Sequence, residues 1–224
     1  MNIILEKLDR GEQVSVARFN DGEVGALLGD LQTTSRGEQQ VNNKLNEGLL
    51  KALMYESPSY YIGFPCPECY PVYHNFTKQK LGNYERQILA TFATNHNYLN
   101  FLVQLEEVLE EKDWLLVSDK DIEFGGHHSH VNCPETNAMD SAKEILNKCL
   151  SSGEDIIVLT CGAASRYLAM KLDKVGKSAL DLGSIFDPLK GKRKRNGKMI
   201  DAHIWEGYSN NTKFCPICNH AGKE

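Results

Sequence analysis

Short apolar runs alternate along this chain with segments of helical period. The runs 114–118 and 155–160 are mostly apolar, as strands buried on both faces are, and 14–19, 60–64 and 178–183 predict further strands. Apolar residues recur every three or four positions in the segments between them, which predicts helices. These helical segments are 3–8, 23–28, 40–54, 75–111 with a break near 95–97, 137–150 and 163–175.

The order of these elements predicts an α/β fold with a Rossmann-like, mostly parallel sheet and helices on both faces. No fixed-period repeat and no Pro, Gly or Ser-rich linker divides the 224 residues, so we expect one domain over 1–224. Parallel sheets of this type bind ligands beyond the carboxyl ends of their strands. The chemistry is therefore expected in the turns that follow strands.

Composition narrows the class of protein. Hydrophobic residues make up 41% and charged residues 25% of the chain, and no apolar run approaches the roughly 18 residues of a membrane span. The N-terminus lacks the features of a signal peptide, so we expect a cytoplasmic chain with no membrane span. The net charge of −5 gives no support to general nucleic-acid binding. The run Lys190 to Lys198 is basic, and it is either a solvated loop or a local contact for a polyanion.

An acidic turn follows the first predicted strand. Arg18, Asp21 and Glu23 lie within six residues, with Gly22 between the two acids. Two close carboxylates suit Mg²⁺ or Mn²⁺ bridging a diphosphate, and a guanidinium pairs well with a phosphate or a carboxylate. The alternative is a surface turn with an aspartate that caps the following helix.

A second turn connects the strand 155–160 to the next helix. Its small residues, Gly162, Ala163 and Ala164, would let backbone N–H groups at the helix N-terminus face a phosphate. Small residues there also let a helix pack closely on a sheet, so the turn alone leaves both interpretations open.

Three segments resemble, in the same order, the motifs of the GT-D class of glycosyltransferases. Residues 17–23 (ARFNDGE) resemble its RFGDGE motif, and 131–138 (VNCPETNA) resemble its VPxxNA segment. Residues 161–169 (CGAASRYLA) and 179–183 (ALDLG) resemble its GPTAxVLAxxL and GxQALDIG segment. The resemblance spans about 13–187, and three ordered matches are more specific than any one of them.

The resemblance implies a Rossmann-like enzyme that transfers a sugar from a nucleotide-sugar donor, with UDP as the nucleotide, to a glycan or glycosylated acceptor. Asp21 and Glu23 would serve a Mn²⁺ or Mg²⁺ cofactor and the diphosphate. The turn at Gly162, Ala163 and Ala164 would lie beside the nucleotide phosphates.

Asp181 would face the ribose or base. Asn20 replaces a glycine of the family's motif, and Ala163-Ala164 replaces Pro-Thr. The segment 183–187 (GSIFD) replaces the family's GHID, so its histidine is missing and Asp187 is the acidic residue that remains. Asp187 joins Asp21 and Glu23 as a candidate catalytic residue.

Two CPxC turns predict a structural zinc. Four thiolates with no open position are typical of a structural zinc site, and the pairing would fix a C-terminal tail of about 200–224 to the loop after the strand 60–64. We expect neither turn to lead from a strand into a helix, which disfavours a thioredoxin-like redox role. The alternative to zinc is that the two cysteine pairs are independent turns with reduced thiols. The ligands would be Cys66, Cys69, Cys215 and Cys218, and the remaining cysteines, Cys133, Cys149 and Cys161, are expected as buried small side chains.

Histidines gather in the segment 124–130, which we expect to be an exposed polar loop. A strand there would instead place His128 and His130 on one face, where they could bind phosphate or metal. Further along the chain, a base and an aromatic platform for a sugar could come from His203, Trp205 and Glu206.

These observations lead to a glycosyltransferase as the first hypothesis. A non-catalytic, zinc-bound Rossmann-like module that binds nucleic acid or a protein partner is the second, and a phosphohydrolase that shares the acidic turn is the third. The catalytic base is open among Asp187, Glu23 and His203.

Overall fold

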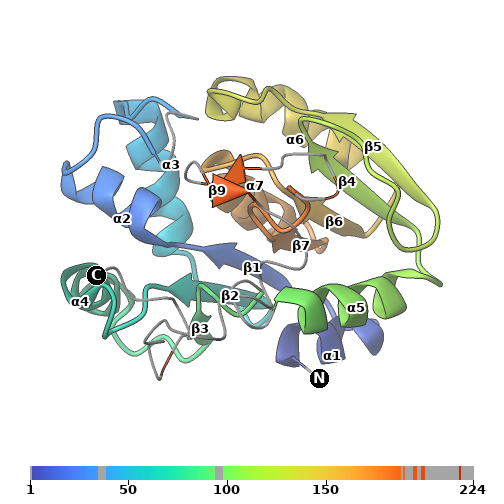
Figure 1. Cartoon of the computed structure of the whole chain (residues 1–224), viewed down its shortest axis with the longest axis horizontal. Coiled ribbons are helices and arrows are strands. Elements are labelled where there is room, and N and C mark those ends of the chain that lie inside the picture. Colours follow the sequence, from blue (N-terminus) through green and yellow to red (C-terminus); the bar gives the residue numbers. More distant parts are fainter. Residues whose placement is uncertain are drawn as a thin grey trace.

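A seven-stranded parallel sheet forms the centre of the protein (Figure 1). The computed structural model describes residues 2–34, 39–93 and 98–187, together with 189, 194–195, 198–199 and 217. The strand order is β3-β2-β1-β7-β6-β4-β5, and all neighbouring pairs are parallel. The α/β fold with a Rossmann-like sheet is thereby confirmed. The strands are β1 (Ser15–Arg18), β2 (Tyr60–Phe64), β3 (Gln87–Leu89), β4 (Trp114–Ser118), β5 (His128–Asn132), β6 (Ile156–Leu159) and β7 (Ser178–Asp181).

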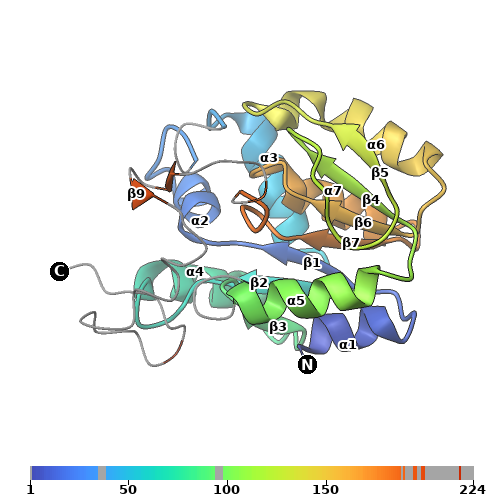
Figure 2. The ribbon, with the colours of Figure 1, turned by 45° about the vertical axis from the view of Figure 1, so that its right-hand side comes forward.

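Helices cover both faces of this sheet (Figure 1 and Figure 2). On one face, α1 (Ile3–Asp9) and α5 (Tyr98–Leu109) lie side by side. On the other face, α3 packs mainly against α7, α6 also packs against α7, and α2 contacts both α3 and α4. The helices of this second face are α2 (Asp21–Leu28), α3 (Asn43–Leu53), α4 (Pro71–Leu81), α6 (Ala142–Ser151) and α7 (Ala164–Asp173), with the 3-10 helix η3 (Ala138–Ser141) before α6.

Alternation along the central strands divides the core into two parts. In β4, Leu115 and Val117 join the core under α3, α6 and α7, whereas Trp114 and Leu116 join the core under α1 and α5. Both faces of β4 are therefore apolar, which is why the strand reads as a continuous apolar run.

The close contact of α3 with α7 depends on a small residue. The side chain of Asn42 accepts the Leu45 N–H (2.9 Å) and so begins α3. A Cβ at Gly48 would lie 2.5 Å from Met139 Cε and 3.5 Å from Tyr167 Cδ2. The glycine therefore leaves room for the side chains between the two helices.

The observed elements correct two predictions. The segment 75–111, predicted to be mostly helical, contains the strand β3, which pairs with β2 at one edge of the sheet. Three residues are too few to show a period of two, so this strand has no recognisable pattern in the sequence. The bounds predicted for β2 and β4 are confirmed.

The second correction concerns the histidine segment. The segment 124–130 was predicted to be an exposed polar loop, but from His128 the chain forms the edge strand β5, parallel to β4, which is the alternative that the sequence analysis left open. The ring of His128 stacks on Trp114, with 4.5 Å between ring centroids. Because an edge strand has one neighbour and one partly solvated face, polar residues can occupy it without an apolar pattern.

Several predicted features lie at or beyond the limit of the described residues. Of the basic run 190–198, the structure describes parts of a small hairpin, β8 (Lys194–Arg195) and β9 (Lys198–Met199). In the described part of the chain, no helix is both long and apolar enough to cross a membrane. The residues that lie outside the described ones are His203, Trp205, Glu206, Cys215 and Cys218.

Candidate functional site at the carboxyl edge of the sheet

The turns singled out in the sequence follow neighbouring strands. The acidic turn follows β1, the glycine turn follows β6, and β7 lies between these two strands. All three strands are parallel, so their carboxyl ends share one edge of the sheet. Open parallel sheets bind ligands beyond this edge.

Arg166, in the first turn of α7, joins these turns. Its Nε donates to the Arg18 carbonyl oxygen (2.5 Å) and lies 3.1 Å from Asp181 Oδ2. Its Nη1 donates to the Gly162 carbonyl oxygen (2.6 Å), and its Nη2 lies 3.2 Å from Glu23 Oε1. One guanidinium therefore contacts β1, β7, α2 and the glycine turn, and its side chain is only 7% exposed.

Asp181 is the buried anion of this network. Its side chain is fully buried, and Oδ2 also accepts the Arg18 N–H (2.8 Å). Oδ1 has no hydrogen-bond partner among the described residues. Burial raises the pKa of Asp181, against the opposing attraction of Arg166 and Arg18. Asp181, predicted to face a ribose or base, has no exposed surface, and it contacts Arg166 and the Arg18 N–H at the end of β1.

Arg18, predicted to bind the cofactor phosphates, points into the protein. Its Nε donates to the Ala90 carbonyl oxygen and its Nη1 to the Leu182 carbonyl oxygen, both at 2.7 Å. A Cβ at Gly183, where φ is +59°, would lie 2.9 Å from Arg18 Nη1. Arg18 therefore connects the ends of β1, β3 and β7 and requires a small residue at 183.

The two acids of the acidic turn have different surroundings. Glu23 is buried: Oε2 accepts the Asn20 N–H (3.1 Å), as in a capping box, while Oε1 pairs with Arg166. Asp21 begins α2 and is half-buried, and no hydrogen bond or ion pair from another described residue reaches its carboxylate. The carboxylate that caps α2 is therefore the buried Glu23 and not an aspartate in a surface turn.

The donor set for a divalent ion is accordingly small. Mg²⁺ and Mn²⁺ at nucleotide sites often use one or two carboxylates, with substrate phosphates and water as the other ligands. Asp21 fits that requirement, whereas both oxygens of Glu23 already have partners. Within the described residues, no three His, Cys, Asp or Glu side chains come together as a metal site.

The glycine turn has the geometry of a tight strand-to-helix connection. Gly162 has φ +58°, and α7 begins at Ala164 with no side-chain cap at Ala163. The Ser165 hydroxyl accepts the Cys161 N–H (3.1 Å). The side chains of Ala163 and Ala164 lie in the core under α7, which is the packing interpretation of the small residues.

Two further polar groups lie in segments that follow strands of the sheet, Asp187 after β7 and Tyr73 after β2. Asp187, predicted to be catalytic, is nearly buried in the segment after β7, where its N–H donates to the Ser184 carbonyl oxygen (3.1 Å). Tyr73 of α4 was not predicted; a Cβ at Gly25 would lie 3.2 Å from its hydroxyl. Burial raises the pKa of Tyr73, and the charges of Asp30 and Asp21 act in the same direction.

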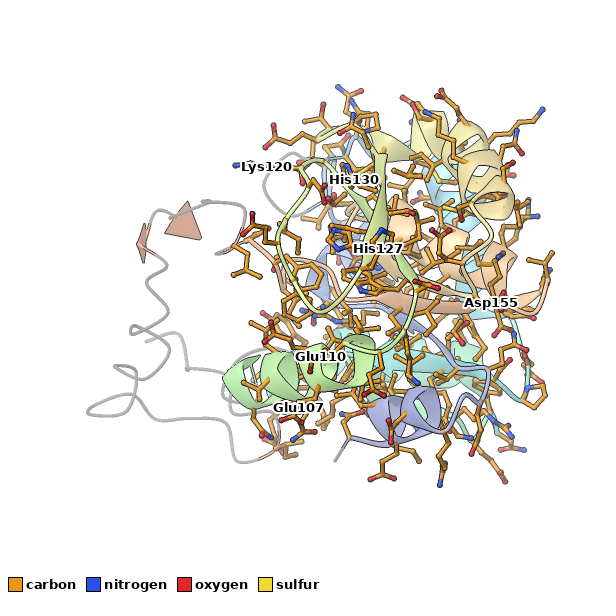
Figure 3. All side chains as sticks on the ribbon, turned by 90° about the vertical axis from the view of Figure 1, so that its right-hand side faces the viewer. Glu107, Glu110, Lys120, His127, His130 and Asp155 are labelled. Carbon is orange, nitrogen blue, oxygen red and sulfur yellow. The ribbon has the colours of Figure 1, made fainter. Side chains whose placement is uncertain are left out.

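The histidine strand lies away from this edge region. β5 is separated from β1 by three strands, about 19 Å at ~4.8 Å per strand. His128 Nε2 lies 3.0 Å from Asp121 Oδ1, and His130 Nε2 lies 3.2 Å from the Ser118 hydroxyl. Figure 3 shows His130 on this outer strand and His127 just before it. The structure therefore does not bring the histidines to the acidic turn.

The cysteines are placed as follows. Cys66 and Cys69 lie between β2 and α4, so the expectation that neither CPxC turn leads from a strand to a helix is wrong for this pair; both precede the helix. The three remaining cysteines are buried, as predicted. Burial raises the pKa of Cys149 to about 12, and the thiol of Cys133 contributes most to lowering the pKa of Cys161.

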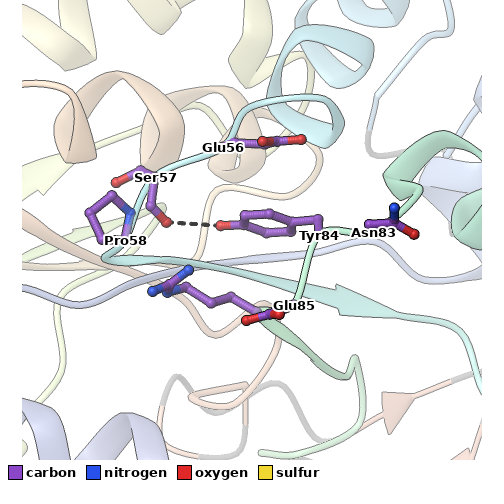
Figure 4. A pocket seen from close by; sticks show the side chains of 7 residues that line it. Glu56, Ser57, Pro58, Asn83, Tyr84 and Glu85 are labelled. Carbon is purple, nitrogen blue, oxygen red and sulfur yellow. Dashed lines mark hydrogen bonds between the residues drawn. The ribbon is translucent and has the colours of Figure 1, made fainter.

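A separate hollow of about 470 Å³ opens at the amino edge of the sheet (Figure 4). Tyr84 crosses it and donates to the Ser57 carbonyl oxygen (3.0 Å). Its walls come from the segments before β2 and β3, so it lies opposite the acidic turn.

Comparisons with known proteins agree with this description of the fold. No protein-family model matches the chain, and no curated protein sequence matches it. By fold and by the turns at its carboxyl edge, the chain falls in the class of Rossmann-like α/β proteins. More particularly, its fold is that of the domain of unknown function 1792.

Three solved structures document this likeness. A selenomethionine structure of that domain matches with a TM-score of 0.65 and 18% identity, over 95% of this chain and 89% of the other. A second, described as a distinct glycosyltransferase fold, matches at 0.63 and 17%, with the same coverage. A third, described as a new glycosyltransferase from Streptococcus sanguinis, matches at 0.65 and 18%, over 90% and 88%.

Proposed function

We propose that this protein is a glycosyltransferase that moves a sugar from a nucleotide-sugar donor, a UDP-sugar, to a hydroxyl of a glycan or glycosylated acceptor. The observation that carries the proposal is a fold shared over about nine tenths of the chain with structures described as glycosyltransferases. The acidic turn and the glycine turn support it, because they lie at the edge where this kind of sheet binds ligands.

The glycine turn is the proposed phosphate site. Gly162 turns the chain in the left-handed region, and the first N–H groups of α7 have no side-chain cap. Such N–H groups and the positive end of the helix dipole favour an anion. Arg166 holds the Gly162 carbonyl, so the turn is fixed before a phosphate arrives.

The acidic turn is the proposed site for the diphosphate's cation. Asp21 would hold a Mn²⁺ or Mg²⁺ ion together with the diphosphate oxygens; such an ion supplies neutralisation of the leaving group's charge. Glu23 stabilises the start of α2, where Asp21 stands, by accepting the Asn20 N–H.

Asp187 and Tyr73 are the proposed groups on the acceptor side. Asp187 follows β7 and would accept the proton of the attacking hydroxyl. Tyr73 and Tyr70 have parallel rings with centroids 6.2 Å apart, and Tyr73 lies over α2. Aromatic rings with a polar end are suited to contact a sugar.

The test is metal-dependent nucleotide binding. In a thermal-shift assay, UDP with Mn²⁺ should raise the unfolding midpoint of the parent, because it binds the native state. Asp21→Asn should remove the metal-dependent part, while Asp140→Asn, which neutralises an exposed acid in η3, should leave it unchanged. If neither UDP nor any other nucleoside diphosphate or its sugars shifts the parent, the glycosyltransferase proposal is wrong.

The proposed structural zinc is tested independently of the donor. Cys66 and Cys69 are the described half of the four-thiolate set. Zinc content measured on purified protein should be about one per chain by the four-thiolate stoichiometry.

A further inference from the structure

The position of Arg166 in the sequence gave no functional signal. In the segment GPTAxVLA that this chain resembles, Arg166 falls on the position x, for which no residue is specified. The structure nevertheless makes it the centre of the polar network, with four partners drawn from residues 18, 23, 162 and 181.

The burial of this network shows that its geometry is specific. The side chains of Arg166, Glu23 and Asp181 are 7%, 9% and 0% exposed. A charged group is rarely buried unless it is paired and hydrogen-bonded, and a guanidinium can contact several acceptors in one plane. Replacement by Lys keeps the charge and loses this fork.

The network also changes what the acidic turn can offer a ligand. Glu23 contributes one oxygen to Arg166 and the other to the Asn20 N–H, whereas Asp21, two residues earlier, has neither contact. The same Arg166 holds the carbonyl of Gly162 across the edge of the sheet. One side chain thereby contacts both turns.

We infer that Arg166 is a positioning residue that fixes the acidic turn and the glycine turn relative to each other, and that Glu23 is its partner and not a ligand of the divalent ion. The inference rests on the proposed function for the identity of the ligands. The contacts that carry it are independent of any ligand.

The first test measures Mn²⁺ binding directly, by the electron paramagnetic resonance signal of free Mn²⁺, with UDP present. Glu23→Gln keeps an oxygen for Arg166 or for the Asn20 N–H and removes the charge. We expect its Mn²⁺ affinity to stay within about twofold of the parent, while Asp21→Asn loses about tenfold or more, as loss of a hard oxygen ligand should cause. A loss in Glu23→Gln equal to that in Asp21→Asn would make Glu23 a ligand and overturn the inference.

The second test needs neither metal nor nucleotide. Amide hydrogen exchange should become faster in Arg166→Lys at both turns, in peptides covering 19–24 and 161–165, with β4 peptides unchanged. Arg10→Lys, in an exposed ion pair with Glu12, is the matched control and should change neither turn. Faster exchange over the whole chain, or at one turn alone, would refute the positioning role.

These two tests separate the possible failures. If the parent binds neither Mn²⁺ nor UDP, the proposed function fails, and the exchange measurement still decides whether Arg166 couples the turns. If the parent binds both and the exchange of the two turns is unchanged in Arg166→Lys, the positioning role fails and the proposed function stands.

Discussion

Replacing Arg166 by Met should strongly destabilise the protein. The change removes the cation from two buried carboxylates, Glu23 and Asp181, and removes the donors to the Arg18 and Gly162 carbonyls. Met retains most of the side-chain length, so the main loss is electrostatic. Removing one partner of a buried ion pair costs about 3–5 kcal/mol, a large part of the 5–15 kcal/mol typical of whole domains.

The carboxylates left behind should account for part of this cost. The double variant that combines Arg166→Met with Glu23→Gln has one neutral side chain in place of a carboxylate. Its loss of stability should therefore be smaller than the sum of the losses in the two single variants. A coupling of about 1–3 kcal/mol is expected for residues in one network.

The pH dependence gives a second, signed prediction. The pKa of Asp181 is raised by burial and held down in part by Arg166, so loss of Arg166 raises it further. Below the unfolded-state pKa, about 3.9, this carboxyl is protonated in both states and its charge costs nothing. As the pH rises through the folded-state pKa, the unfolded state releases its proton first and stability is lost. The deficit of Arg166→Met should therefore be smallest near pH 4 and grow towards neutral pH.

Urea unfolding followed by circular dichroism measures the loss of stability in Arg166→Met, its coupling to Glu23→Gln and its dependence on pH. The midpoint should fall with little change in the denaturant slope, which marks a change of stability within a two-state transition. Arg10→Met, at an exposed ion pair, should change the free energy of unfolding by less than about 1 kcal/mol. A loss below about 1 kcal/mol in Arg166→Met, or strict additivity in the double variant, would refute the account of the network.

Three further predictions concern other parts of the chain. Gly183→Ala should lower the free energy of unfolding by about 1–3 kcal/mol more than Gly153→Ala in the same assay. Both glycines have positive φ, but only a Cβ at residue 183 would meet Arg18. Equal losses in the two variants would show that this contact is relieved without cost. Cys66→Ser should abolish zinc binding measured by atomic absorption, and an unchanged zinc content would show that Cys66 is not a zinc ligand. Cys149, with a pKa raised to about 12, should resist alkylation at pH 8 in the native state and react after unfolding; rapid native labelling would contradict its burial.

Some parts of the fold follow from the sequence because their causes are local. The apolar runs of β4 and β6 and the period of the helices reflect burial that each segment shows by itself. The acidic turn after β1 and the glycine turn after β6 were placed correctly for the same reason. Short or edge strands were missed, since β3 has three residues and β5 carries polar side chains.

The tertiary structure decided which of these turns meet. Residues 18 and 181 are 163 positions apart, and the pairing of β1 with β7 makes them neighbours. That pairing depends on the order in which crossover connections arrange the strands, and this order has no local signature in the chain. The sequence therefore indicated two carboxylates in one turn, and only the fold showed that Glu23 pairs with Arg166 while Asp21 lies outside that network.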